Sequence, residues 1–120
     1  TARLEVAIQA VLPGATPAQF DTLAARPVCG CAECVRAHGL RVRLGDETRL
    51  YAGALYGAGE DAYAQTLGMF SLAEDLLQRA GMAFGDVVRT WIHLREMERD
   101  YPHLNRARRE FFTARGIDPV

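Results

Sequence analysis

Residues 87–94, with the sequence V-V-R-T-W-I-H-L, alternate between two kinds of side chain. A period of two is typical of a β-strand, because successive side chains in a strand point to opposite faces of a sheet. One face of this predicted strand is apolar and β-branched, so we expect helices to cover it. The other face needs water, a partner subunit or a ligand, and it carries Arg89, Trp91, His93 and Arg95.

Similar alternation predicts strands over residues 1–12, 40–44 and 48–55. Turn residues at Gly45 and Asp46 join the last two strands into a hairpin. Even-numbered positions are apolar in both strands of the hairpin, so we expect them to share the face that helices cover. The apolar set is Leu40, Val42, Leu44, Leu50, Ala52 and Ala54, and the polar face carries Arg41, Arg43, Arg49, Tyr51 and Gly53.

Apolar residues recur at helical spacing in two further stretches. The first predicts a helix over residues 61–80 that Gly81 ends. The second predicts a helix with Asp100 as its N-cap and Pro102 in its first turn, ended by Gly116. We therefore expect an α+β fold in which a single mixed β-sheet carries two helices on one face. A short helix is also expected over residues 18–25. The first apolar stripe is Tyr63, Leu67, Phe70, Ala73 and Leu77, widened by Met69, Leu72 and Leu76, and the second is Leu104, Ala107 or Arg108, and Phe111.

The chain has 120 residues, enough for one domain with a moderate core. Its 14 basic and 15 acidic residues nearly balance, which gives no reason to expect nucleic acid or an anionic membrane as a partner. No apolar run is long enough to span a bilayer. We therefore expect a soluble, cytoplasmic protein, and three cysteines within six positions fit a reducing compartment better than a disulfide framework.

Those cysteines and a histidine follow the spacing C-x-C-x2-C-x3-H. Three thiolates and an imidazole at close range suit a tetrahedral zinc ion, whereas iron–sulfur chemistry is less well served without a fourth cysteine. The alternative is a loop in which the cysteines are small apolar fillers and the histidine is at the surface. The candidate zinc ligands are Cys29, Cys31, Cys34 and His38.

The polar face of the predicted strand over residues 87–94 is the candidate site for chemistry. An arginine such as Arg89 can hold a substrate carboxylate through two hydrogen bonds, and Trp91 can exclude water beside it. His93 can move a proton near neutral pH, and Tyr51 on a neighbouring strand adds an aromatic group. The alternative is that this face is buried between subunits, where its residues only satisfy each other.

Five motifs follow one another along the chain: L-Y-A-G-A at 50–54, Gln65 in the next helix, A-G at 80–81, V-V-R-T-W-I-H-L-R-E-M at 87–97, and Tyr101, Leu104, Asn105 and Phe111-Phe112. In this order they resemble the Rid (YjgF-like) superfamily over residues 40–120. Two of its sequence motifs, R-T-W-I-x-L-R and N-R-A-R-R-E-F-F, resemble chorismatase-like and natural-product-cluster members more closely than the housekeeping enamine/imine deaminases.

The resemblance implies a homotrimer with small-molecule clefts between subunits, and it predicts no organic cofactor and no metal. It implies that Tyr51 and Gly53 line the cleft and that Asn105 fixes the backbone near its mouth. The family's carboxylate-clamping arginine follows the second helix in a P-x-R-[ST] motif, which this chain lacks. Two explanations stay open. Either the chain is truncated, or it is a permuted domain or a piece of a longer chain. In the second case, residues 1–12 correspond to the family's last strand, and Glu5 corresponds to the glutamate that transfers a proton in the family's deaminases.

The expected organisation is an N-terminal strand and linker over residues 1–27, a Cys-rich loop over 28–39 and a Rid-like core over 40–120. The resemblance implies an enzyme of secondary metabolism that acts on a small carboxylate, either a chorismatase-like hydrolase or lyase or an enamine/imine deaminase. The alternative is a non-catalytic Rid-like binding or scaffold protein, with or without a structural zinc. The candidate catalytic residues are His93 and Glu5, and the candidate substrate-binding residues are Arg89, Trp91, Tyr51, Gly53 and Asn105.

Overall fold

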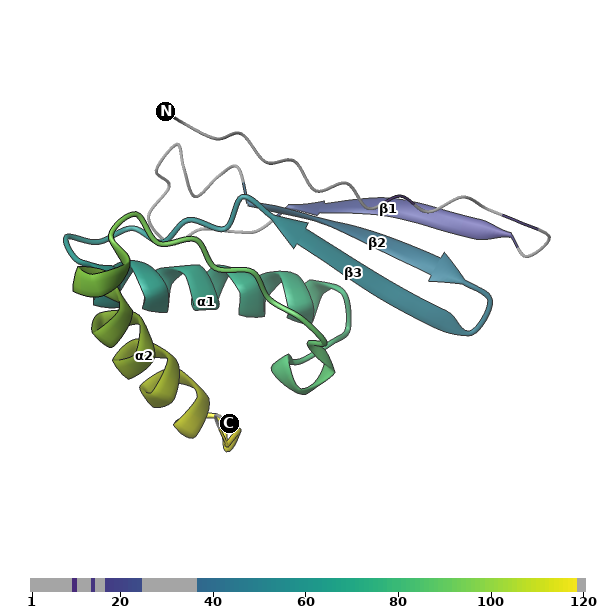
Figure 1. The fold of residues 1–120 in the computed structure, drawn as a ribbon. Coiled ribbons are helices and arrows are strands. Elements are labelled where there is room, and N and C mark those ends of the chain that lie inside the picture. Colours follow the sequence, from purple (N-terminus) through teal and green to yellow (C-terminus); the bar gives the residue numbers. More distant parts are fainter. Residues whose placement is uncertain (1–9, 11–13, 15–16, 25–36, 119–120) are drawn as a thin grey trace, which may run out of the picture.

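The computed structural model describes residues 10, 14, 17–24 and 37–118. Helix α1 lies against one face of the sheet, and α2 packs on α1 (Figure 1). The predicted α+β class is confirmed, while the sheet is antiparallel throughout the described residues rather than mixed. The elements are β1 (Ala18–Ala24), β2 (His38–Leu44), β3 (Glu47–Gly53), α1 (Ala62–Arg79), the short 3-10 helix η2 (Phe84–Asp86) and α2 (Met97–Thr113).

The predicted hairpin is confirmed as β2 and β3, but its faces were predicted wrongly. A two-residue turn at residues 45–46 pairs Leu44 with Glu47, and hence even-numbered residues of β2 with odd-numbered residues of β3. Residues directly opposite each other in an antiparallel ladder share a face. The prediction places the even-numbered residues of both strands on one apolar face. Lengthening or shortening a hairpin loop by one residue moves every side chain of one strand to the opposite face of the sheet. The length of the turn therefore decides which side chains meet the helices.

The face of the sheet that meets α1 contains Gly39 of β2. A Cβ atom at this position would lie 3.7 Å from Leu76 of α1. Leu23 of β1 and Ala52 of β3 lie opposite Gly39 in the two ladders, so they share this face. The hydrophobic core between sheet and helix consists of Ala37, Leu72 and Leu76, with Leu23, Leu50 and Leu55 packed against them.

The prediction of a short helix over residues 18–25 is wrong for its described part, because residues 18–24 form strand β1. Its seven residues pair antiparallel with β2, and this pairing places Asp21 opposite Arg41. The Nε atom of Arg41 donates to both carboxylate oxygens of Asp21 at 3.1 Å. The same contact lowers the pKa of Asp21 from its ordinary value. Tertiary pairing with a distant strand thus overrides the weak local helix signal.

Helix α1 confirms the prediction over residues 61–80. The side chain of Asp61 caps its N-terminus by accepting a hydrogen bond from Ala64 N at 2.8 Å. Gly81, with a φ of 77°, follows its end. While one side of α1 meets the sheet, Phe70 packs on α2: its ring centroid lies 5.3 Å from that of Phe111. Phe84 and Phe112 complete this aromatic cluster.

Helix α2 begins earlier than predicted. Its N-cap is Glu96 rather than Asp100, and Asp100 N donates to Glu96 O at 2.9 Å as part of the first turn. Arg99 forms ion pairs with both acidic residues, at 2.9 Å and 2.7 Å, which ties this turn together. Pro102 lies inside the helix. The predicted core stripe is confirmed by the buried residues Leu104, Ala107 and Phe111.

The predicted strand over residues 87–94 is not part of the sheet. The segment runs without helical structure and without a ladder to any described strand, from η2 back along α1 to the start of α2 (Figure 1). Ile92 and Leu94 are partly buried, whereas Val88 is 99% exposed. The alternation of the sequence is present, but the hydrogen-bonding neighbour that a strand requires is not found among the described residues.

Neither α1 nor α2 has the length and the apolar character that a membrane-crossing helix needs.

An ion pair between α1 and the residues that follow α2 is expected to make the free energy of unfolding depend on pH. Arg115 donates to Glu74 Oε1 from Nη2 at 2.8 Å, and this hydrogen bond lowers the pKa of Glu74 below its ordinary 4.5. A lowered pKa contributes stability that is complete above the ordinary value and is lost as the pH falls through the folded value. Urea unfolding below pH 4.5 should therefore show a loss of stability that Glu74→Gln reduces.

The control for this prediction is Glu60→Gln, since Glu60 is exposed and forms no ion pair with a described residue. Its stability profile should follow that of the wild type. An unchanged profile in the Glu74→Gln protein would show that the ion pair does not stabilise the helix pair.

Candidate functional site

Two of the predicted site residues, Arg89 and Trp91, lie together on the segment 87–94. The guanidinium carbon of Arg89 lies 5.3 Å from the centroid of the Trp91 ring. Such a cation–π contact at an exposed site contributes about 0.5–1 kcal/mol, enough to favour one orientation of the arginine. The indole itself is 71% exposed. The pair therefore presents a partly ordered guanidinium and an open aromatic surface to the solvent.

Arg89 differs from several other arginines of the chain in its partners. Arg41, Arg79 and Arg99 each pair with a carboxylate, and so do Arg49 and Arg115. Within the described part of the chain, Arg89 contacts the ring of Trp91 and no acidic side chain. Its N–H donors are therefore available to an external anion, and a guanidinium binds a carboxylate through two parallel hydrogen bonds.

His93 lies two residues beyond Trp91 and is exposed. Along an extended chain, positions two residues apart point to the same side. Trp91 and His93 are exposed while Ile92 and Leu94 are partly buried, which agrees with an imidazole on the side of Trp91, and an imidazole there could exchange a proton with a bound group.

The predicted residues outside this segment lie elsewhere and have other partners. Tyr51, in β3, hydrogen-bonds Arg49, and this contact together with Glu47 raises the pKa of Arg49 above its ordinary value. Asn105, in α2, accepts a hydrogen bond from Arg108 at 2.9 Å. Among the described residues, no hydrogen bond, ion pair or ring contact joins these residues to Arg89 or Trp91. A single chain thus assembles part of the predicted site and not the whole of it.

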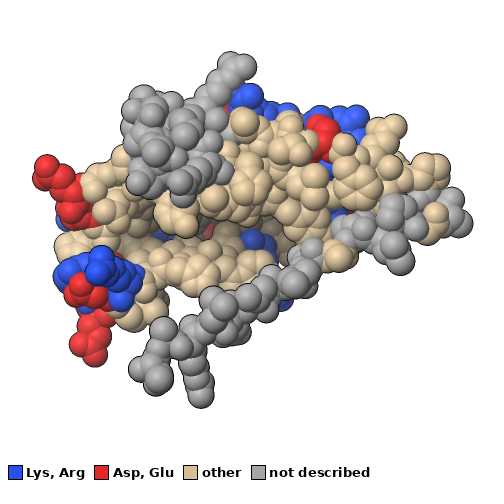
Figure 2. All heavy atoms as spheres, turned by 90° about the horizontal axis from the view of Figure 1, so that it is seen from above, with Lys and Arg blue, Asp and Glu red and all other residues tan. Residues whose placement is uncertain are grey.

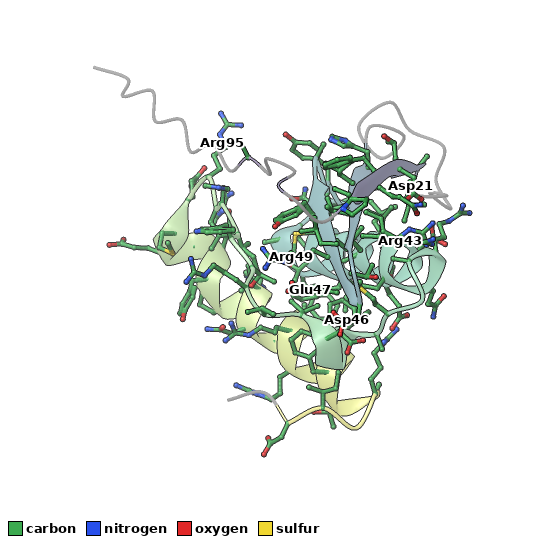
Figure 3. All side chains as sticks on the ribbon, turned by 90° about the vertical axis from the view of Figure 1, so that its right-hand side faces the viewer. Asp21, Arg43, Asp46, Glu47, Arg49 and Arg95 are labelled. Atoms are coloured by element: carbon green, nitrogen blue, oxygen red, sulfur yellow. The ribbon has the colours of Figure 1, made fainter. Side chains whose placement is uncertain are left out.

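Charged side chains gather instead at the free end of the hairpin. Viewed from that end, Arg43, Asp46, Glu47 and Arg49 lie at the hairpin and Asp21 lies on the neighbouring strand β1, while Arg95 lies on the other side, near the start of α2 (Figure 3). From above, acidic and basic side chains gather at the left end and along the upper edge, and uncharged side chains cover most of the rest of the described surface in this view (Figure 2). Acidic and basic side chains are mixed at this end of the hairpin, and ion pairs join Asp21 to Arg41 and Glu47 to Arg49. This region therefore offers little net attraction for an anion.

The candidate metal site and one candidate catalytic residue lie largely outside the described residues. Cys29, Cys31, Cys34 and Glu5 all fall there. His38 is described: it is the first residue of β2, exposed, and opposite Gly53 of β3. The described residues contain no group of three or more potential metal ligands. The zinc hypothesis for the cysteine segment therefore stays a prediction.

Sequence reasoning missed two shallow clefts between the helices. One, of about 320 Å³, lies between the starts of α1 and α2, and the other, of about 290 Å³, lies beside Arg115. Both contain charged groups, but Arg99 pairs with Asp100 in the first cleft and Arg115 with Glu74 in the second. Because these charges are already compensated, neither cleft offers a free cation comparable to Arg89. The lining residues of the larger cleft are Glu60, Asp61, Ala62, Gln65, Arg99, Asp100 and His103.

The segment 87–94 therefore provides the candidate site of the described chain, with Arg89, Trp91 and His93 as its functional side chains. The α+β architecture agrees with the class that the Rid resemblance implies, and membership of that superfamily stays a prediction. Comparison with protein-family models, with curated proteins and with solved structures gives no match.

Proposed function

We propose that this chain is a Rid-like enzyme of secondary metabolism that acts on a small carboxylate-bearing metabolite. The reaction would be that of a chorismatase-like hydrolase or lyase, or that of an enamine/imine deaminase. One observation carries the proposal: Arg89 lies over Trp91 and pairs with no carboxylate of the described chain. A guanidinium in this state is a binding site for the carboxylate of another molecule.

Each residue has a distinct role in this proposal. Arg89 binds the substrate carboxylate through two N–H donors and fixes its orientation. Trp91 covers one side of the bound molecule with its ring. His93, on the same side of the segment, donates or accepts the proton that hydrolysis, elimination or imine hydrolysis requires. Glu5 is a second candidate for the proton transfer.

The second candidate function is non-catalytic: a Rid-like binding or scaffold protein, with structural zinc at the cysteine segment as one variant. The 71% exposure of Trp91 favours it, because catalysis by charge and proton transfer is more effective where water is excluded. Binding of a carboxylate by Arg89 is common to both candidates. They differ in whether His93 changes the bound molecule.

Replacing Arg89 by leucine should weaken carboxylate binding by about 10- to 100-fold, because a hydrogen-bonded charged pair contributes about 1.5–3 kcal/mol. Trp91 is the only tryptophan of the chain, so its fluorescence reports on this site directly. Titration with chorismate and with pyruvate, one large and one small carboxylate, measures the dissociation constants. Arg89→Lys should lie between the wild type and Arg89→Leu, since lysine keeps the charge and loses the paired donor geometry.

The matched control is Arg109→Leu, which removes an exposed arginine of α2 far along the chain from the segment. It should leave both titrations unchanged. Equal affinity in the Arg89→Leu and wild-type proteins would contradict the proposed site. His93→Gln then separates the two candidates: loss of turnover of chorismate or an imino acid with binding retained supports the enzyme. Binding without turnover by the wild-type protein supports the binding protein.

A further inference from the structure

The chain around Arg89 makes few contacts with the rest of the described molecule. Every residue from 85 to 91 is exposed, and Val88 is 99% exposed. The nearest residues that are partly buried are Phe84 upstream of Arg89 and Ile92 downstream. A stretch with so little buried surface is not held in place by its own packing. The position of Arg89 therefore depends on the residues that attach this stretch at its two ends.

The upstream attachment is the short helix η2, whose two ends are closed by hydrogen bonds. At its start, the Asp86 carboxylate accepts a hydrogen bond from Ala83 N at 2.9 Å. At its end, Val87 N donates to Phe84 O at 3.1 Å. These bonds fix the direction in which Val87 leaves the turn. Arg89 follows only two residues later, so the turn sets the path of the backbone towards it.

The ring of Phe84 attaches this turn to both helices. Its centroid lies 6.1 Å from that of Phe70 in α1, and 5.4 Å from those of Phe111 and Phe112 in α2. All three contacts are edge-to-face, which is a favourable arrangement of aromatic rings at these separations. Phe84 is thus the residue through which the stretch before Arg89 packs against the helices.

We propose that Phe84 is a positioning residue of the candidate site: acting through η2, it holds the chain in the conformation in which Arg89 lies 5.3 Å from the Trp91 ring. The inference rests on the proposed function for what the site binds, whereas the ordering of Trp91 requires no ligand. Without the Phe84 ring, the chain samples other conformations. The apparent dissociation constant of a carboxylate then rises in inverse proportion to the fraction of molecules that stay competent to bind.

Phe84→Ala tests this role, with Phe112→Ala as the matched control. Phe112 is also partly buried and belongs to the same aromatic cluster, 5.2 Å from Phe70, but it lies in α2 and not beside the site. Both substitutions remove one ring from the cluster, so both should lower the midpoint of urea unfolding. Only Phe84→Ala should increase the fast component of the time-resolved fluorescence anisotropy of Trp91, measured without ligand.

The affinity for carboxylates should separate the same two variants. In titrations with chorismate and with pyruvate, Phe84→Ala should raise the dissociation constants about three- to tenfold, as expected if about a third to a tenth of the molecules stay competent. Phe112→Ala should leave them unchanged. Phe84→Leu keeps an apolar side chain in the cluster and should restore most of the affinity and of the anisotropy.

A second pair of variants tests the turn without removing a ring. Asp86 is exposed, and Asp86→Ala removes the acceptor for Ala83 N. This variant should change the Trp91 anisotropy and the dissociation constants in the same direction as Phe84→Ala. Asp86→Asn keeps an acceptor oxygen and should stay close to the wild type.

The outcomes distinguish the positioning role from the proposed function. Equal anisotropy and equal affinity in Phe84→Ala and Phe112→Ala would overturn the role of Phe84 and leave the carboxylate site in place. A wild-type protein that binds neither carboxylate would contradict the proposed function. The anisotropy of the ligand-free variants would still decide whether Phe84 orders Trp91.

Discussion

Alanine in place of Gly57 is expected to lower the free energy of unfolding by about 3 kcal/mol, because it would force the loop after β3 away from α1. A Cβ atom at Gly57 would lie 1.6 Å from the carbonyl oxygen of Gln65 and 2.5 Å from its carbonyl carbon. Both are backbone atoms of a helix, so they cannot turn aside as a flexible side chain would. Gly68 of α1 lies across the same contact, with the Cα of Gly57 3.1 Å from its ideal Cβ position.

Urea unfolding followed by far-ultraviolet circular dichroism measures this loss. Gly85→Ala is the matched control, since a Cβ at Gly85 would have no atom within 4 Å. That substitution should be neutral or slightly stabilising, because alanine restricts the unfolded chain more than glycine does. Equal stability of the two alanine variants would mean that the loop does not pack on α1 as the structure describes.

Alanine in place of Leu76 is expected to cost about 2–5 kcal/mol, the range for removing a large buried aliphatic side chain. Leu76 of α1 has no exposed surface and packs against the sheet, with Ala37 and Leu72 as buried neighbours. Since a domain of this size is stable by only about 5–15 kcal/mol, the loss removes a large share of the total. The midpoint of urea unfolding should fall accordingly.

Leu76→Met is the control for cavity formation, because it nearly conserves side-chain volume and should cost less than about 1.5 kcal/mol. A second control, Gln78→Ala, changes an exposed residue of the same helix and should have a small effect. If Leu76→Ala were as stable as Leu76→Met, the side chain would not form the core between helix and sheet.

The elements that depend on nearby residues could be predicted from the sequence. Asp61, Gly81 and the apolar stripe between them predict α1 with its ends, and the structure confirms it. The turn at residues 45–46 likewise predicts the hairpin. These signals are local, because capping and turn formation involve atoms within a few residues of one another.

Other features depended on contacts that a local pattern does not contain. Strand β1 exists through pairing with β2 and through the contact between Asp21 and Arg41, which are twenty residues apart. The faces of the hairpin followed from its register, which differs from the expected one by a single residue of turn length. Alternation over residues 87–94 predicted a strand, but alternation supplies only faces and no hydrogen-bonding partner.

The same division applies to the candidate site. The sequence by itself determined that Arg89, Trp91 and His93 share one side of an extended segment, because spacing by two residues fixes the side in any extended chain. It singled out Arg89 by its place beside Trp91 and His93, but it could not tell which of the chain's 14 arginines pair with a carboxylate. Only the tertiary structure decided that Arg41, Arg99 and Arg115 pair with carboxylates while Arg89 lies over an indole, because charge pairing depends on which distant side chains folding brings within a few ångströms.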